Sequence, residues 1–223
     1  MRARLLWIGC AVLVVAVVAV GTILLVGGRD AAREDDRILI VIDAGHGGRD
    51  PGAVCDDVKE ADVNLAIARR IAERIEADER LDVETTRAID ITVSLEDRIA
   101  VANEGRATAY LSIQSNACAY PEATGVVSLV SDRLPPDDRS WQLAEILQDA
   151  VTDATGARDR GVRSQDLYLH RAEMPAVLIE VGFLTNDGER AKLLDPAYQQ
   201  TIAQGIYDGL LRYLQHTDPT FGP

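Results

Sequence analysis

The fold is decided by one stretch of sequence, Ile38-Leu39-Ile40-Val41-Ile42-Asp43-Ala44-Gly45-His46-Gly47-Gly48. The residues from Arg37 to Ala44 are mostly aliphatic and β-branched, which is typical of a strand buried on both faces of a sheet. The glycine-rich segment 45–52 then predicts a loop. From Glu60 aliphatic residues recur every fourth position as far as residue 75, which indicates one face of a helix. A strand, a loop and a helix in this order predict the start of an α/β domain.

The rest of the chain continues this alternation. Predicted strands are 81–86, 110–114, 125–131, 167–170 and 176–181, and predicted helices are 60–78, 95–104, 140–153 and 198–215. Ser94 and Asp97 resemble a capping arrangement for the second of these helices. Strands that alternate with helices predict a single α/β domain with a mostly parallel or mixed sheet flanked by helices.

The start of the chain differs from the remainder. Residues 5–26 form an unbroken run of apolar or small residues, which as a helix is long enough to cross a bilayer core. Arg2 and Arg4 precede it and favour a cytoplasmic N-terminus with the remainder exported. We therefore predict a transmembrane signal anchor at 1–26, a juxtamembrane spacer at 27–37, a folded domain at 38–216 and a tail at 217–223. The alternative is a signal peptide that is cleaved to release a secreted protein, although its apolar region usually spans only about 7 to 15 residues.

The charge of the chain excludes some partners. There are 23 lysine and arginine residues against 36 aspartate and glutamate residues, for a formal net charge of −13. So acidic a protein is not expected to bind nucleic acid or an anionic phospholipid surface. Outside the apolar run the cysteines are Cys55 and Cys118, and in an oxidising compartment this pair could form one disulfide.

Three side chains are candidates for chemistry. His46 follows the first predicted strand, at the end of the sheet where α/β folds gather functional groups, and the glycines beside it leave the imidazole accessible. Glu180 ends an apolar strand, where a carboxylate is costly unless it is paired, hydrogen-bonded or bound to metal. Glu60 opens the first predicted helix, a position where the helix dipole alone also stabilises an acid.

These residues belong to a longer series of motifs. The series comprises Asp43-Ala44-Gly45-His46-Gly47-Gly48, Asp50-Pro51-Gly52-Ala53, Glu60 with Asn64-Leu65-Ala66, Thr86-Arg87, Ser94-Leu95 with Arg98, Ala102-Asn103, Ser112-Ile113 and the segment 175–186. In this order the motifs resemble the zinc-dependent N-acetylmuramoyl-L-alanine amidase family, which cleaves peptidoglycan. The resemblance spans about residues 38–215, and so many ordered matches make it specific.

The resemblance implies a zinc ion held by His46, Glu60 and a second histidine, with Glu180 as the catalytic glutamate. Three protein ligands leave a fourth position for water, and zinc lowers the pKa of that water to about 7. The implied activity is hydrolysis of the amide bond between N-acetylmuramic acid and L-alanine, on the extracytoplasmic side of the membrane. Arg87, Arg98 and Asn116 are candidate substrate-binding residues, although salt bridges with the abundant acids explain the two arginines equally well.

One position departs from the family's pattern. The family's third ligand is the histidine of a Ser-Ile-His motif, whereas this chain has Ser112-Ile113-Gln114. Glutamine offers zinc only a neutral carbonyl oxygen, and zinc prefers imidazole, thiolate and carboxylate. Three outcomes stay open, namely weak coordination by Gln114, replacement by a thiolate of Cys118 or Cys55, and a site without metal. We favour an active amidase, and the alternative is a noncatalytic domain that binds or regulates at the cell wall.

Overall fold

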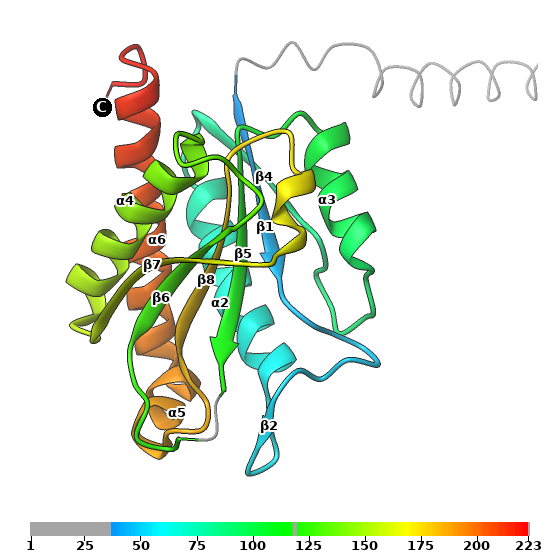
Figure 1. Ribbon diagram of the computed structural model, residues 1–223, viewed down its shortest axis with the longest axis vertical. Helices are drawn as coiled ribbons and strands as arrows, with labels where there is room; N and C mark the ends of the chain where they lie inside the picture. Colours follow the sequence, from blue (N-terminus) through cyan, green and yellow to red (C-terminus); the bar gives the residue numbers. More distant parts are fainter. Residues whose placement is uncertain (1–36, 118–119, 223) are drawn as a thin grey trace, which may run out of the picture. The chain divides into compact units, whose positions relative to one another are not determined.

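A six-stranded sheet forms the centre of the protein in the computed structural model, which describes residues 37–117 and 120–222 (Figure 1). In the order in which they lie side by side, the strands are β4 (Leu81–Thr85), β1 (Ile38–Ala44), β5 (Ala109–Asn116), β8 (Ala176–Phe183), β6 (Val126–Ser131) and β7 (Asp159–Gln165). The first four of these run parallel, whereas β6 pairs with β8 in the antiparallel direction and with β7 in the parallel direction. The predicted α/β fold with a mixed, mostly parallel sheet is therefore confirmed.

Helices cover both faces of this sheet (Figure 1). Three long helices, α2 (Glu60–Glu76), α4 (Arg139–Thr155) and α6 (Pro196–Thr217), pack on one face. The other face carries α3 (Leu95–Glu104) and the short 3₁₀ helix η1 (Tyr168–Arg171). Two smaller elements complete the fold, a hairpin of β2 (Val54–Cys55) and β3 (Val58–Lys59) before α2, and the helix α5 (Asp187–Leu194) after β8. The predicted cap of α3 is also confirmed, since the Ser94 hydroxyl accepts a hydrogen bond from the Asp97 main-chain nitrogen.

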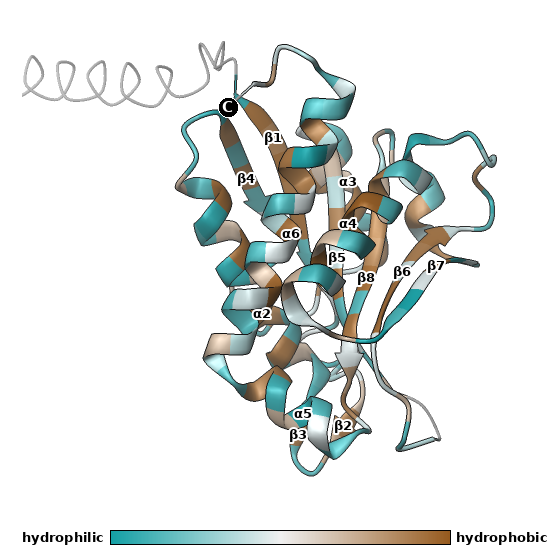
Figure 2. Ribbon diagram, turned by 90° about the vertical axis from the view of Figure 1, so that its left-hand side faces the viewer, coloured by the Kyte–Doolittle hydropathy of each residue, from teal (hydrophilic) through white to brown (hydrophobic). Residues whose placement is uncertain are grey.

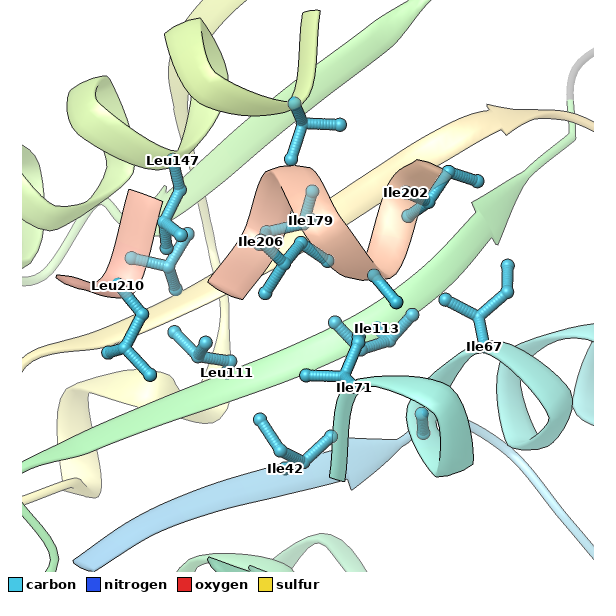
Figure 3. Close-up of a cluster of buried hydrophobic side chains, with 14 of the residues drawn as sticks. Ile42, Ile67, Ile71, Leu111, Ile113, Leu147, Ile179, Ile202, Ile206 and Leu210 are labelled. Carbon is cyan, nitrogen blue, oxygen red and sulfur yellow. The ribbon is translucent and has the colours of Figure 1, made fainter. Parts of the chain in front are cut away.

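Alternation along the strands divides the apolar core in two. On β1, Ile40 and Ile42 face the layer of α2, α4 and α6, whereas Val41 between them faces α3. Because both faces are covered, the central strands β1, β5, β8 and β6 are largely apolar, while the helices are apolar on one side only (Figure 2). The larger cluster joins the strands to α2, α4 and α6 (Figure 3), and its labelled members are Ile42, Ile67, Ile71, Leu111, Ile113, Leu147, Ile179, Ile202, Ile206 and Leu210.

One predicted strand is wrong, and one strand of the six-stranded sheet was missed along with the two short strands of the hairpin. Residues 167–170 were expected to be extended, but the chain curls into η1, which buries Leu169 beneath the sheet. The additional strand is β7, whose sequence Asp-Arg-Gly-Val-Arg-Ser-Gln is mostly polar and half exposed. It lies at the edge of the sheet and pairs only with β6. An edge strand does not need the apolar run that marks a central one, so the hydrophobic pattern gave no signal for it.

The two ends of the chain bear on the predicted boundaries. Within residues 37–117 and 120–222 no helix combines the length and the apolar character that a membrane crossing requires. The predicted anchor at 1–26 and Cys118 lie outside the described residues. At the other end, Phe221 is only 7 % exposed and joins the larger core cluster. Its ring lies 4.5 Å from the guanidinium carbon of Arg80, so part of the predicted tail at 217–223 packs on the domain.

Candidate functional site

His46 lies in the loop that leaves the carboxyl end of β1. Its backbone is left-handed, with a φ of 59°, and the two glycines that follow have φ values of 124° and 63°. Glycine adopts such angles freely, whereas a histidine does so at a cost of about 1–3 kcal/mol. The strained backbone is therefore a local feature that the rest of the structure must hold in place.

Arg87 holds this loop from beneath. Its guanidinium donates to the main-chain oxygens of Ala44 at 2.8 Å, Gly45 at 2.9 Å and Ala61 at 2.8 Å. Since Ala61 belongs to α2, the same side chain links the loop to the helix that carries Glu60. Arg87 is 3 % exposed, and all of these partners are internal.

Arg98, from α3, holds the loop at the next position. It donates to the main-chain oxygens of Ala44 at 2.8 Å and His46 at 2.7 Å, and it forms an ion pair with Asp43. Burial opposes the charged form of this arginine, but the Asp43 carboxylate raises its pKa. The hydrogen bonds of both predicted substrate-binding arginines are with the protein itself, and Arg98 also lines the cavity beside the imidazole. A role in substrate binding stays a prediction.

The imidazole of His46 lies between two carboxylates. Its Nε2 is 3.3 Å from Glu60 Oε1, and its Nδ1 is 2.8 Å from Asp50 Oδ2. The hydrogen bond to Glu60 is the largest of the effects that raise the pKa of His46 to about 9, with a further contribution from Asp50, against the opposing effect of burial. The other oxygen of Glu60 accepts from the main-chain nitrogen of Ala53 at 3.0 Å. The structure therefore brings His46 and Glu60 together, as the resemblance implied.

Glu180 and Gln114 are neighbours on two adjacent central strands, in the half of each strand that lies toward its carboxyl end. Gln114 on β5 is paired in register with Glu180 on β8. Glu180 Oε2 is buried and has no hydrogen-bond partner among the described residues. Burial, and after it repulsion from the charge of Glu60, raises the pKa of Glu180 to about 8. An unpaired carboxyl oxygen in such a place marks a functional site, because burial without a partner is costly.

Asn64 joins these residues, although the sequence motif to which it belongs indicated no role for it. It is fully buried on α2, one turn after Glu60. Its Nδ2 lies 3.3 Å from Glu60 Oε1 and 3.1 Å from Gln114 Oε1, and its Oδ1 accepts from the Ser115 hydroxyl at 2.9 Å. The spacing of four residues from Glu60 puts both side chains on one face of the helix, which is the signal that could have revealed it.

A cavity of about 250 Å³ opens beside the imidazole. Its lining includes the side chains of His46, Asp50, Leu95, Gln114 and Tyr168. Asn116, the third predicted substrate-binding residue, lies two residues beyond Gln114 and does not line this cavity; its main-chain oxygen accepts from the Leu184 nitrogen at 2.8 Å. The cavity is where a substrate would meet the imidazole and the amide.

Two side-chain atoms of the site are suited to bind one divalent cation. His46 Nε2 and Glu60 Oε1 face each other, and an imidazole nitrogen and a carboxylate oxygen are ligands that zinc prefers. The unpaired oxygen of Glu180 is a further group that a nearby positive charge would stabilise. No three histidine, cysteine, aspartate or glutamate side chains within 37–117 and 120–222 are gathered closely enough to hold a metal ion. The third ligand that the resemblance implies falls at Gln114, whose side-chain amide is neutral.

The fold and the site together define a class, an α/β domain with an imidazole, two acids and an amide at the carboxyl end of its parallel strands. A model of the N-acetylmuramoyl-L-alanine amidase family matches residues 40–212. The chain belongs to that family, and the resemblance that the motifs indicated is confirmed.

Individual relatives agree with this assignment. The chain is 33 % identical over 184 residues to the uncharacterised protein YqiI of Bacillus subtilis, which covers 82 % of this chain and 88 % of YqiI. It is 35 % identical over 175 residues to the N-acetylmuramoyl-L-alanine amidase LytC of the same organism, but this covers 78 % of this chain and only 35 % of LytC. Among solved structures, an N-acetylmuramoyl-L-alanine amidase from Clostridium difficile 630 superimposes with a TM-score of 0.79 at 34 % identity, covering 82 % of this chain and 100 % of that one.

Proposed function

We propose that this protein hydrolyses the amide bond between N-acetylmuramic acid and L-alanine in peptidoglycan. The family assignment supports this reaction. The observation that carries it is the buried, unpaired carboxyl oxygen of Glu180. This residue lies close enough to His46 and Glu60 for their charges to affect its pKa. A protein that needed only to bind wall fragments would gain nothing from this costly carboxyl group.

Each side chain has a part in the proposed reaction. When bound at His46 and Glu60, a zinc ion would act as a Lewis acid toward the scissile amide. Asp50 accepts the Nδ1 proton of His46, which leaves Nε2 free to act as a ligand. Glu180 accepts a proton from the attacking water and passes it to the departing nitrogen. A cation held by His46 and Glu60 would lower the pKa of the neighbouring Glu180 carboxyl group, which would then serve as the base at neutral pH.

The test is the release of stem peptides from purified cell wall. The unchanged protein with added zinc is compared with Glu180→Gln, which keeps the size of the side chain and removes the base. We expect release by the unchanged protein and a loss of about 10²–10⁴-fold in the variant. Equal rates would contradict the role of Glu180. Binding to the wall without release by either protein would instead support the alternative, a noncatalytic wall-binding or regulatory domain, which the glutamine at position 114 favours.

We also propose that the domain acts outside the cytoplasm, anchored by the segment 1–26. The apolar run at 5–26 with two arginines before it supports this topology. Full-length protein should remain with the membrane fraction, and added protease should digest the domain in cells whose surface is accessible. A shortened protein in the medium would favour the cleaved signal peptide instead.

A further inference from the structure

The side-chain amide of Asn64 has only one orientation that its neighbours permit. The main-chain oxygen of Gly45 lies 3.5 Å from Asn64 Nδ2, and Glu60 Oε1 lies 3.3 Å from the same atom. A carbonyl oxygen and an ionised carboxylate can only accept hydrogen bonds, so both require the amino group of Asn64 on this side. On its other side Asn64 Oδ1 accepts from the Ser115 hydroxyl at 2.9 Å.

This amino group in turn sets the orientation of Gln114. Asn64 Nδ2 lies 3.1 Å from Gln114 Oε1, so the carbonyl oxygen of Gln114 is directed toward Asn64. The amide lies flat against Gly45, where a Cβ atom would come within 2.1 Å of Gln114 Nε2. Gln114 lines the cavity beside His46. In the described part of the chain, Gln114 Nε2 is not one of the buried polar atoms that lack a hydrogen-bond partner. The carbonyl oxygen is therefore engaged, and the amino group is the end that is left to meet a ligand.

We propose that Gln114 serves as a hydrogen-bond donor to the substrate and not as a metal ligand. Asn64 keeps the carbonyl oxygen, and Nε2 donates to the carbonyl oxygen of the amide to be cut. Negative charge develops on that oxygen during hydrolysis, and removal of a donor placed there costs about 10²–10³ in rate. The identity of the acceptor rests on the proposed function, whereas the orientation of the amide does not.

A measurement of zinc affinity tells whether Gln114 is a hydrogen-bond donor to the substrate or a metal ligand. It is measured by competition with a chromophoric chelator in the unchanged protein, Gln114→Ala, Gln114→His and the exposed control Gln200→Ala. We expect Gln114→Ala and the control to stay within about threefold of the unchanged protein, since a donor contributes nothing to the metal. Gln114→His should bind zinc at least about tenfold more tightly, because it adds a preferred ligand. A loss of about tenfold or more in Gln114→Ala would overturn the proposal.

Hydrogen exchange of the side-chain amides tests the orientation even if zinc binds too weakly to measure. In nitrogen-15 spectra the amino protons of Asn64 should exchange slowly, because its two protons are shared among three acceptors in a buried place. The amino protons of Gln114 should exchange rapidly, because Gln114 lines the cavity and its carbonyl oxygen is the end that Asn64 holds. Protected Gln114 protons beside exposed Asn64 protons would overturn the proposal.

Turnover separates this inference from the proposed function. Gln114→Glu keeps the size of the side chain, replaces the donor by an acceptor and adds a charged ligand for zinc. We expect its zinc affinity to rise while kcat falls about 10²–10³-fold. Tighter zinc binding with unchanged kcat would overturn the donor role. If the unchanged protein releases no peptide while the exchange pattern is as expected, the proposed function and the donation to substrate both fail, and only the orientation of the amide stands.

Discussion

Arg98 and Asp43 form an ion pair in the interior, with 2.5 Å between Nη1 and Oδ1. The same guanidinium donates to the main-chain oxygen of His46 at 2.7 Å. One side chain thus connects the end of β1 to the residue that carries the imidazole. The Asp43 carboxylate also accepts from the hydroxyls of Thr86 at 2.6 Å, Ser112 at 2.7 Å and Tyr168 at 3.4 Å, so both of its oxygens are engaged.

The first prediction concerns this pair. Arg98→Gln is expected to lower the free energy of unfolding by about 3–5 kcal/mol, because it leaves the buried Asp43 carboxylate without its ion-pair partner. Urea denaturation followed by circular dichroism measures the change. The matched control is Arg171→Gln, whose ion pair with Glu96 joins side chains that are 57 % and 69 % exposed. The control should cost about 0–1 kcal/mol, and similar losses in both variants would contradict the role assigned to the buried pair.

The second prediction concerns pH and Glu180 in metal-free protein. Burial and the nearby Glu60 raise the pKa of Glu180 to about 8, above its ordinary value of 4.5. The folded state therefore holds this proton more tightly than the unfolded state does. The stabilisation that this provides is complete below about pH 4.5 and is lost as the pH rises through 8. The side chain of the Glu180→Gln variant does not titrate. As the pH rises across this range, the free energy of unfolding of the variant should therefore increase relative to that of the unchanged protein by a few kcal/mol.

Urea denaturation at about pH 5 and about pH 8.5, in the presence of a chelator, provides the measurement. His46 titrates in both proteins, so the difference between them reports mainly on Glu180. A constant difference at the two pH values would show that the carboxyl group is not held in the buried, unpaired state.

The fold could be predicted from the sequence where apolar periodicity is strong. The apolar run of β1 and the apolar residues at every fourth position of α2 have no competing interpretation, because both elements are packed against the core. The pattern failed at β7 and η1, where it carries little information. A half-exposed edge strand lacks an apolar run, and the apolar residues near Leu169 fill a gap under the sheet without joining it.

The site was predictable in part, for a similar reason. His46 follows the end of β1 and Glu180 is the one acid in the apolar sequence of β8, and both features can be read from the sequence. The parts played by Arg98 and Asn64 depend on contacts with residues far away in the chain, 55 positions for the pair with Asp43 and 50 for the bond to Gln114. A single sequence carries no record of such contacts.

The third prediction concerns the C-terminal residues. Phe221→Ala is expected to lower the free energy of unfolding by about 3 kcal/mol, because the ring is buried against the core and the Arg80 guanidinium. Gly222→Ala is the control, since a Cβ atom there would meet nothing within 4 Å. It should change stability by less than about 0.5 kcal/mol. If a chain that ends at residue 216 proves as stable as the full one, the packing of Phe221 contributes nothing.

The last prediction concerns Gly45, on which the Gln114 amide rests. A Cβ atom at position 45 would lie 2.1–2.2 Å from three atoms of that amide, so Gly45→Ala must displace it. We expect a loss of about 1–3 kcal/mol in the free energy of unfolding, together with altered exchange of the Asn64 amino protons as their acceptor moves away. Gly188→Ala is the control, because its Cβ would meet only Asn186 Oδ1 at 3.4 Å, an ordinary contact.

If Gly45→Ala matches this control in both stability and exchange, the amide is not seated where the structure places it. If instead the variant loses turnover and the slow exchange of the Asn64 amino protons but keeps its zinc affinity, the contact with Gly45 positions Gln114 as a donor and not as a ligand. The absence of a side chain at position 45 then matters as much as the glutamine at position 114, because the Gln114 amide can lie flat only if the loop leaves it room.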